Sequence, residues 1–404
     1  MDFNDSLDEA TYRARARDWL EINVPPATDG SERSQMAASR AWQAVKAAAG
    51  YSCITWPEAW GGQGGSQMEA VIFHQEESRF QVPFDPFEFS LGICMPTLLN
   101  YTDDAGRERF AGPAIRGDEI WCQLLSEPAA GSDLAAVRTR ALPADDSSGD
   151  WILNGHKVWT TFAHIADFGL ALCRTDPGVA KHRGLTMFWV DMRAPGVTIE
   201  PIHQMSGGSD FNEVFLSDVR IPDSQRLGAV GGGWNASLYM MMHERVALGG
   251  SRGPDWPQVI EAARHTPGLR GTALGDQALR ERIAEWYVQS EGLKHLRSRA
   301  LTALSKGETP GPENSIGKLI AGLQIQDMMA GASEVLEEYG ILDDPALSPL
   351  ASAFNRSLLY VPGIRIAGGT DEILKNIIAE RVLGMPSDIR VDKDVVFSEI
   401  PRKR

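Results

Sequence analysis

The sequence predicts an α+β fold, mainly α, in which helices are followed by strands and then by helices again. Apolar residues recur at helical spacing in residues 1–120 and 231–404, whereas 121–230 holds several short strand-like runs separated by turns. Such runs are typical of a small β-sandwich or barrel. The 404 residues therefore predict an N-terminal helical domain (1–120), a middle β-domain (121–230) and a C-terminal helical bundle (231–404), in line with roughly 150 residues per domain.

The first part is predicted to be helical because its apolar residues fit a period of about 3.6 better than an alternating pattern. Met68, Val71 and Ile72 are an example of this spacing. The Gly-rich run 56–65 begins with Trp-Pro and is predicted to be a turn that interrupts the helices.

The middle part contains a predicted β-hairpin. Asn154-Gly155 separates the strand-like runs Trp151-Ile152-Leu153 and Lys157-Val158-Trp159, and Asn-Gly readily adopts the positive φ angles of a type I′ turn. Further strands are predicted at 169–173, 185–191, 197–200 and 212–221.

Helical spacing returns after the glycines at 231–233. Leu279, Ile283 and Trp286 follow it, and the long apolar face within 316–339 suits a helical bundle, including one shared between subunits. The segment 253–275 is rich in Gly, Pro and polar residues and is predicted to be a loop insertion.

Composition excludes several classes of function. A net charge of -15 and a pI near 5.0 disfavour a nucleic-acid-binding surface. Four scattered cysteines without CxxC spacing predict buried, reduced thiols and no metal site. No run of about 18 apolar residues predicts a membrane span, and the acidic start of the chain lacks a signal-peptide pattern. The predicted location is the cytoplasm.

The loop 125–133 is the first segment with candidate chemistry. Ser126, Ser132 and the backbone near Gly131 can donate several hydrogen bonds to one anion or ring edge, and glycine lets the backbone approach closely. An ordinary turn with serine caps explains the local pattern equally well.

The full string Ser-Glu-Pro-x-Ala-Gly-Ser-Asp decides between these two interpretations. It resembles the flavin-contacting signature of acyl-CoA dehydrogenases, and the resemblance extends to the turn 56–65, to 154–161 and to 376–381. The resemblance implies an N-terminal helical domain, a middle β-domain and a C-terminal four-helix bundle. It also implies FAD as cofactor, an acyl-CoA substrate and an electron-transfer flavoprotein as electron acceptor.

The same resemblance assigns cofactor-binding residues. Leu125 and Ser126 would face the flavin ring, while Gly131 and Ser132 would meet the pyrophosphate or the substrate. Trp159 would lie against the flavin, and Thr161 would hydrogen-bond its N5 edge. Two further contacts are implied where the turn 366–370 meets the following helix, whose N-terminal N–H groups suit phosphate; these come from Thr370 and Glu372.

The general base is predicted to be Glu244. Removal of an α-proton from a thioester, while a hydride leaves Cβ for flavin N5, needs a positioned carboxylate in a dry site. Many family members carry Glu where this chain has Gly368, whereas branched-chain and long-chain members carry Glu-Arg on an earlier helix, as in Glu244-Arg245 here. The Gly368 N–H would be one donor to the thioester oxygen, a ribityl hydroxyl of FAD the other, and Arg245 would organise the site. The alternative is a surface carboxylate paired with Arg245.

Two other enzyme motifs are excluded. His243-Glu244 is not a metalloprotease helix, because Leu248 stands where the second histidine of HExxH is required. The glycines at 231–233 do not form GxGxxG in a βαβ unit, so a Rossmann site is not supported.

Two elements of the family pattern are absent. Homotetrameric members carry Arg-x-x-Phe-Gly near the position of Arg264 or Arg270, and Gly-Gly-x-Gly after the position of Gly340. In lacking both elements, the chain is similar to bacterial dehydrogenases that act on CoA thioesters of steroid side chains. In those enzymes two different subunits share each cofactor. The resemblance thus allows either a homo-oligomer or a heterotetramer with a related subunit. It also allows a bulky or branched substrate. A non-catalytic subunit and an acyl-CoA oxidase or flavin monooxygenase are the alternative functions.

Overall fold

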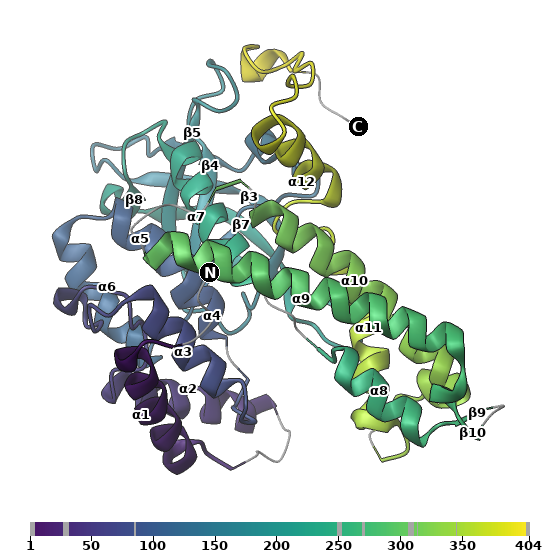
Figure 1. Ribbon diagram of the computed structural model, residues 1–404. Coiled ribbons are helices and arrows are strands. Elements are labelled where there is room, and N and C mark those ends of the chain that lie inside the picture. Colours follow the sequence, from purple (N-terminus) through teal and green to yellow (C-terminus); the bar gives the residue numbers. More distant parts are fainter. Residues whose placement is uncertain are drawn as a thin grey trace. The chain divides into compact units, whose positions relative to one another are not determined.

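The computed structural model describes residues 5–26, 32–84, 86–248, 253–268, 271–305, 311–312, 314–344 and 346–400. The chain divides into two compact units (Figure 1). Unit 1 comprises Met1–Ile202, Asp210–Glu244 and Arg390–Arg404, and unit 2 comprises His203–Ser209 and Arg245–Ile389. The domain boundaries predicted at 120 and 230 remain a prediction.

Unit 1 begins with helices, two of which start at a capping motif in the sequence. Ser6 and Ser66 cap α1 and α3 through Ser-x-x-Glu capping boxes, in which the serine hydroxyl and the glutamate three residues later each accept a backbone N–H. A π-helix, Ser90–Cys94, precedes α5. The helices are α1 (Leu7–Asn23), α2 (Glu32–Ala48), α3 (Gln67–Glu77), α4 (Phe87–Phe89), α5 (Met95–Tyr101) and α6 (Asp104–Arg116).

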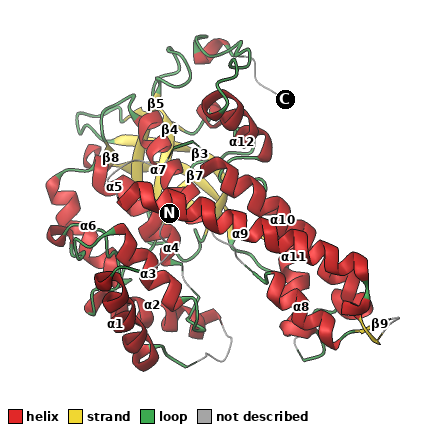
Figure 2. Cartoon of the chain, in the orientation of Figure 1, coloured by secondary structure: helices red, strands yellow, loops and turns green. Residues whose placement is uncertain are grey.

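The strands of unit 1, drawn in yellow in Figure 2, form a sheet. This sheet has eight strands, with the order β6-β7-β3-β2-β4-β5-β8, and β1 pairs with β4 in parallel. The predicted strands and the middle β-domain are thus confirmed. The strands are β1 (Trp121–Leu124), β2 (Arg140–Pro143), β3 (Trp151–Thr161), β4 (Phe168–Arg174), β5 (Leu185–Asp191), β6 (Val197–Ile202), β7 (Phe211–Ile221) and β8 (Arg226–Leu227).

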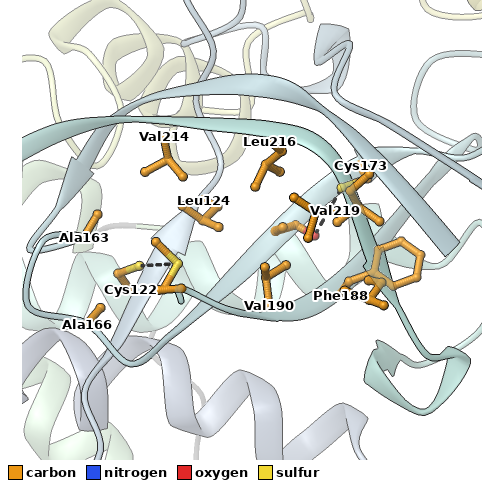
Figure 3. Close-up of a cluster of buried hydrophobic side chains, with 14 of the residues drawn as sticks. Cys122, Leu124, Ala163, Ala166, Cys173, Phe188, Val190, Val214, Leu216 and Val219 are labelled. Carbon is orange, nitrogen blue, oxygen red and sulfur yellow. Dashed lines mark hydrogen bonds between the residues drawn. The ribbon is translucent and has the colours of Figure 1, made fainter. Parts of the chain in front are cut away.

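The sheet encloses a hydrophobic core (Figure 3). Alternate residues of a strand point to the same face, and this period places Cys122 and Leu124 of β1 in the core, together with Val214 and Leu216 of β7. Because β1 is anchored here, the loop that follows Leu124 starts from a fixed point.

The predicted Asn154-Gly155 hairpin is wrong, because both residues lie inside the single long strand β3. The Asn154 side chain bonds Asp218 of β7 instead, donating to its carboxylate at 2.9 Å and accepting its N–H at 3.0 Å. A Cβ on Gly155 would lie 2.2 Å from Thr139 Oγ1. The glycine therefore permits close strand packing at a register shift. The positive φ angle at this point of the sheet belongs to Asp218 on β7, not to Asn154 or Gly155.

Unit 2 is helical, and the predicted bundle is confirmed. Four of its helices, α8 to α11, contribute to one buried core, which includes Val259, Trp286, Met329 and Phe354. The helices that begin after residue 230 are α7 (Gly233–Leu248), which starts in unit 1, α8 (Trp256–His265), α9 (Gln277–Ser305), α10 (Asn314–Leu336), α11 (Ala353–Ile364) and α12 (Asp371–Ile377), which continues into a π-helix, Ile378–Val382.

The loop predicted at 253–275 is also wrong, because most of it is helix α8 followed by the short strands β9 (Pro267–Gly268) and β10 (Gly271–Thr272). Asp255 caps α8, and Gln258 accepts the Asp255 N–H at 3.0 Å. Proline in the first turn of a helix leaves no extra donor unpaired, so Pro257 starts this helix rather than breaking it.

The hydropathy of the helices and the burial of the cysteines are two further features of the fold. Among the residues that the structure describes, no helix is long and apolar enough to cross a membrane. Cys94, Cys122 and Cys173 are buried free thiols, as predicted, whereas Cys53 is only partly buried.

Candidate active site

The loop 125–133 leaves the buried strand β1 and turns sharply at the surface of unit 1. Glu127 and Ala130 exchange backbone hydrogen bonds of 3.1 and 3.0 Å. Leu125 is buried and Ser126 is half-buried, whereas Gly131, Ser132 and Asp133 are exposed. The loop therefore has an anchored beginning and an accessible tip.

A buried ion pair supports this loop from below. The Lys157 ammonium has no exposed side-chain surface and lies 2.9 Å from Glu127 Oε1. It also donates to the carbonyls of Leu125 at 3.0 Å and Leu172 at 2.7 Å, so all three of its donors are used.

The carboxylate of this pair is equally well bonded. Glu127 accepts the backbone N–H groups of Arg138 at 2.6 Å and Thr139 at 2.8 Å. Burial acts to raise the pKa of Glu127, but the Lys157 charge and these hydrogen bonds bring it below its ordinary value. A fully satisfied buried pair of this kind fixes geometry. No role is predicted for Lys157 from the sequence, although a lysine within an otherwise apolar strand is a usable signal.

Trp159 lies directly beside the loop. The Val158 N–H donates to the Ser126 carbonyl at 2.9 Å, and a register shift in β3 follows Lys157. At this irregularity Trp159 has φ 60° and 59% of its surface exposed. A bulge that re-aims a side chain is common next to active sites. Thr161 is half-buried and pairs with Phe211 of β7.

Glu244 lies on the inner face of α7. Met240 and Ala236, four and eight residues earlier, are fully buried, and Glu244 continues their row and is half-buried. The start of α7 is pressed against β5, since a Cβ on Gly233 would lie 2.7 Å from the Thr186 Cα. The carboxylate is therefore held on a fixed helix rather than on a loop.

The negative charge of Glu244 acts on the buried Cys94 thiol. The pKa of the fully buried Cys94 thiol is well above its ordinary value because of burial, with further contributions from Cys122 and the negative charge of Glu244. Cys94 ends the π-helix Ser90–Cys94, whose Ser90 hydroxyl accepts the Trp121 N–H of β1 at 3.1 Å. The π-helix that ends at Cys94 thus supports the strand that carries the loop 125–133.

His243 adjoins the candidate base. Its ring lies 4.8 Å from that of Tyr239, measured between centroids. Burial lowers the pKa of His243, so the ring is neutral at neutral pH. The side chain of Arg245 lies outside the described part of the structure.

Unit 2 contains the other predicted residues. Gly368 and Gly369 have φ 63° and 101°, conformations that favour glycine. The buried Lys318 ammonium donates to the Gly369 carbonyl at 2.6 Å. Thr370 caps α12 by accepting the Ile373 N–H at 3.3 Å, and Glu372 is exposed.

The structure thus brings some of the predicted residues together within one unit. Ser126 and Trp159 lie side by side through the Val158 hydrogen bond, and Glu244 belongs to the same unit. Gly368, Thr370 and Glu372 belong to unit 2, so their grouping with Glu244 stays a prediction.

Comparison with known proteins identifies the family. Residues 6–118, 122–219 and 231–383 match the acyl-CoA dehydrogenase N-terminal, middle and C-terminal domains, respectively. The chain is 35% identical to the acyl-CoA dehydrogenase IpdE1 of Mycobacterium tuberculosis over 95% of this chain and 99% of that protein. The chain belongs to the acyl-CoA dehydrogenase family. It is accordingly an oxidoreductase that acts on acyl-CoA.

Solved acyl-CoA dehydrogenases have the same fold. The chain resembles the Tcur3481-Tcur3483 steroid ACAD with a TM-score of 0.81 and 25% identity, covering 96% of this chain and 100% of that chain. It resembles the ChsE4-ChsE5 complex from Mycobacterium tuberculosis with a TM-score of 0.78 and 27% identity, over 96% and 100% of the two chains. The family resemblance expected from the sequence is confirmed.

Acyl-CoA dehydrogenases are flavoproteins that use FAD, and two features of unit 1 fit this cofactor. Trp159 offers an exposed aromatic face, the kind of surface on which planar rings stack. A Cβ on Gly131 would meet nothing within 4 Å, so the exposed loop backbone is open to a close-lying anion.

Proposed function

We propose that this acyl-CoA dehydrogenase introduces an α,β double bond into a bulky acyl-CoA thioester, with Glu244 as the general base. The observation that carries the proposal is the position of Glu244 on the buried face of α7, in one row with the buried Ala236 and Met240. A carboxylate in such surroundings can take a proton from a weak carbon acid more readily than one in water. Position 368, the other place for a base in this family, is glycine.

Each residue of the site has a separate task in this reaction. When bound, FAD accepts the hydride that leaves Cβ. Glu244 removes the α-proton. The Gly368 N–H donates to the thioester oxygen, where negative charge develops, and Arg245 organises the site.

The proposed cofactor contacts fall into two groups of residues. Leu125 and Ser126 would face the flavin ring, with Trp159 against it and Thr161 at its N5 edge. Gly131 and Ser132 would meet the pyrophosphate or the substrate, and Thr370 and Glu372 would bind the cofactor at the N-terminus of α12. The Glu127–Lys157 pair supports these contacts by fixing the backbone of the loop 125–133.

The substrate class is proposed from the relatives. The Tcur3481-Tcur3483 protein is a steroid ACAD, and we propose a CoA thioester of a steroid side chain for this chain. Turnover of such a thioester should exceed turnover of butyryl-CoA by at least about tenfold, because a pocket shaped for a large apolar group gains transition-state binding from it. Glu244→Gln should abolish turnover of both, whereas Glu285→Gln, an exposed position on α9, should not. Retained turnover by Glu244→Gln would refute the base assignment.

We propose further that the chain works in an assembly with a related subunit and passes electrons to an electron-transfer flavoprotein. The ChsE4-ChsE5 structure is a complex, which supports a heteromer. Native mass spectrometry of the purified protein, with FAD counted per chain, tests this. A homo-oligomer with one FAD in every chain would contradict it.

A further inference from the structure

The segment 390–400, named here the return segment, belongs to unit 1, although unit 2 precedes it in the chain. It lies along the loop that joins β4 to β5. The Phe397 N–H donates to the Val179 carbonyl at 2.9 Å, and the Ser398 N–H donates to the Pro177 carbonyl at 3.0 Å. Ala180 and Val396 form an antiparallel bridge. The return segment is therefore docked by backbone pairing.

Phe397 anchors this docking. Only 5% of its surface is exposed, and the guanidinium carbons of Arg174 and Arg138 lie 3.7 and 5.0 Å from its ring centroid. Burial lowers the pKa of Arg174 to about 10, so this side chain is charged at neutral pH. Both distances suit cation–π attraction, which is stronger where water is excluded.

The two arginines connect Phe397 to the candidate cofactor loop. Arg174 donates to the carbonyls of Ala135 at 2.5 Å and Val137 at 3.3 Å, directly after the loop 125–133. The backbone N–H of Arg138 donates to Glu127, whose carboxylate belongs to the buried pair under that loop. A single aromatic ring thus packs on both residues that hold the end of the loop.

Lys181 makes a second connection. Its ammonium lies 2.8 Å from Asp133 Oδ1 and 2.8 Å from Asp392 Oδ2, with 8% of its side chain exposed. Asp133 follows Ser132 in the loop, and Asp392 belongs to the return segment. Because Lys181 bonds both carboxylates, the loop tip and the return segment share one nearly buried cation.

We propose that the return segment positions the cofactor loop, and that Phe397 and Asp392 are positioning residues for FAD binding at Gly131 and Ser132. This inference rests on the proposed function, because it takes the loop 125–133 as part of the FAD site. Loss of either anchor frees the loop end, and FAD must then order a loop that the intact protein holds in place.

The test compares FAD affinity in matched variants. The protein is purified as it occurs, with its partner subunit if that co-purifies, its flavin is removed, and FAD is titrated by quenching of flavin fluorescence. Phe397→Ala should raise the FAD dissociation constant about tenfold, within the usual range of coupling between sites. Phe397→Leu and Asp392→Asn should raise it less. Asp394→Asn, an exposed carboxylate on the same segment, should leave it unchanged.

A second measurement separates positioning from general loss of stability. Backbone amide exchange of the flavin-free protein should accelerate at Ala130, Arg138 and Thr139 in Phe397→Ala, with the unit 2 helices unchanged. If Phe397→Ala fails to fold, the two milder variants, Asp392→Asn and Phe397→Leu, decide the question. Wild-type FAD affinity and wild-type exchange in Asp392→Asn and Phe397→Leu would overturn the inference and leave the proposed function intact. A wild-type protein that binds no FAD would overturn both.

Discussion

Lys157 and Glu127 form an ion pair of 2.9 Å beneath the candidate cofactor loop, and the lysine side chain is entirely buried. The pair connects strand β3 to the loop 125–133, and the same ammonium bonds the Leu125 carbonyl. Removal of one partner of a buried pair leaves the other charge uncompensated. The loop geometry therefore depends on both residues.

Lys157→Met should lower the free energy of unfolding by about 3–5 kcal/mol, the usual cost of breaking a buried pair. Lys157→Met with Glu127→Gln should lose less than the sum of the single variants, because no buried charge is then left unpaired. Chemical denaturation of the four proteins gives the coupling. Additive losses would mean that the two side chains act independently.

Trp159→Ala should weaken FAD binding about tenfold, consistent with ~1–3 kcal/mol for stacking on an aromatic side chain. The stability of the flavin-free protein should change little, because the indole is 59% exposed. Fluorescence titration with FAD and a thermal melt of the flavin-free protein measure the two effects. Trp159→Phe keeps a ring and should retain most of the affinity. Equal affinity in the alanine variant would remove Trp159 from the site.

His243 should make stability depend on pH. Burial lowers its pKa below the ordinary value of 6.5, so the unfolded chain takes up this proton at a higher pH than the folded protein does. The contribution of the neutral ring is complete above pH 6.5 and is lost as the pH falls through the folded pKa.

His243→Phe keeps a ring beside Tyr239 but cannot titrate. Its melting temperature should therefore fall less than that of the wild type between about pH 6.5 and 5. His203→Asn, at an exposed position, is the control and should follow the wild type. Identical pH profiles for wild type and His243→Phe would show that the folded state does not lower this pKa.

The turn before α12 should depend on glycine. Gly369 has φ 101° but space around it, since a Cβ would meet its nearest atom at 3.6 Å. Gly369→Ala should therefore destabilise unit 2 through backbone strain alone, by about 1–2 kcal/mol. Gly363→Ala, in the helix α11 with nothing within 4 Å of its Cβ position, should stabilise by up to ~1 kcal/mol. Thermal unfolding of the two variants compares them directly, and the same sign for both would be inconsistent with these backbone angles.

Local patterns in the sequence predicted the order of elements and most strands, because alternation and helical spacing report directly which face is buried. Two errors came from reading turn residues without their surroundings. Asn154 has its partner in Asp218, 64 positions away, and no local rule reveals that pairing. The helix α8 could have been predicted, since Asp255 and Pro257 form a helix start.

Candidate site residues can be proposed from the sequence where they stand in contiguous motifs, whereas supporting residues from distant strands cannot. Ser126 and Trp159 each stand in a motif. Lys181 and Phe397 stand in none and connect to the loop through contacts that only the folded chain makes.

Anaerobic mixing with a reducible acyl-CoA, followed by visible flavin absorbance, tests the role of Glu244 most directly. Glu244→Gln should bind FAD and substrate but bleach at least about a hundredfold more slowly than the wild type, as expected for loss of a general base. Glu285→Gln should bleach at the wild-type rate. Bleaching of Glu244→Gln at the wild-type rate would contradict Glu244 as the base.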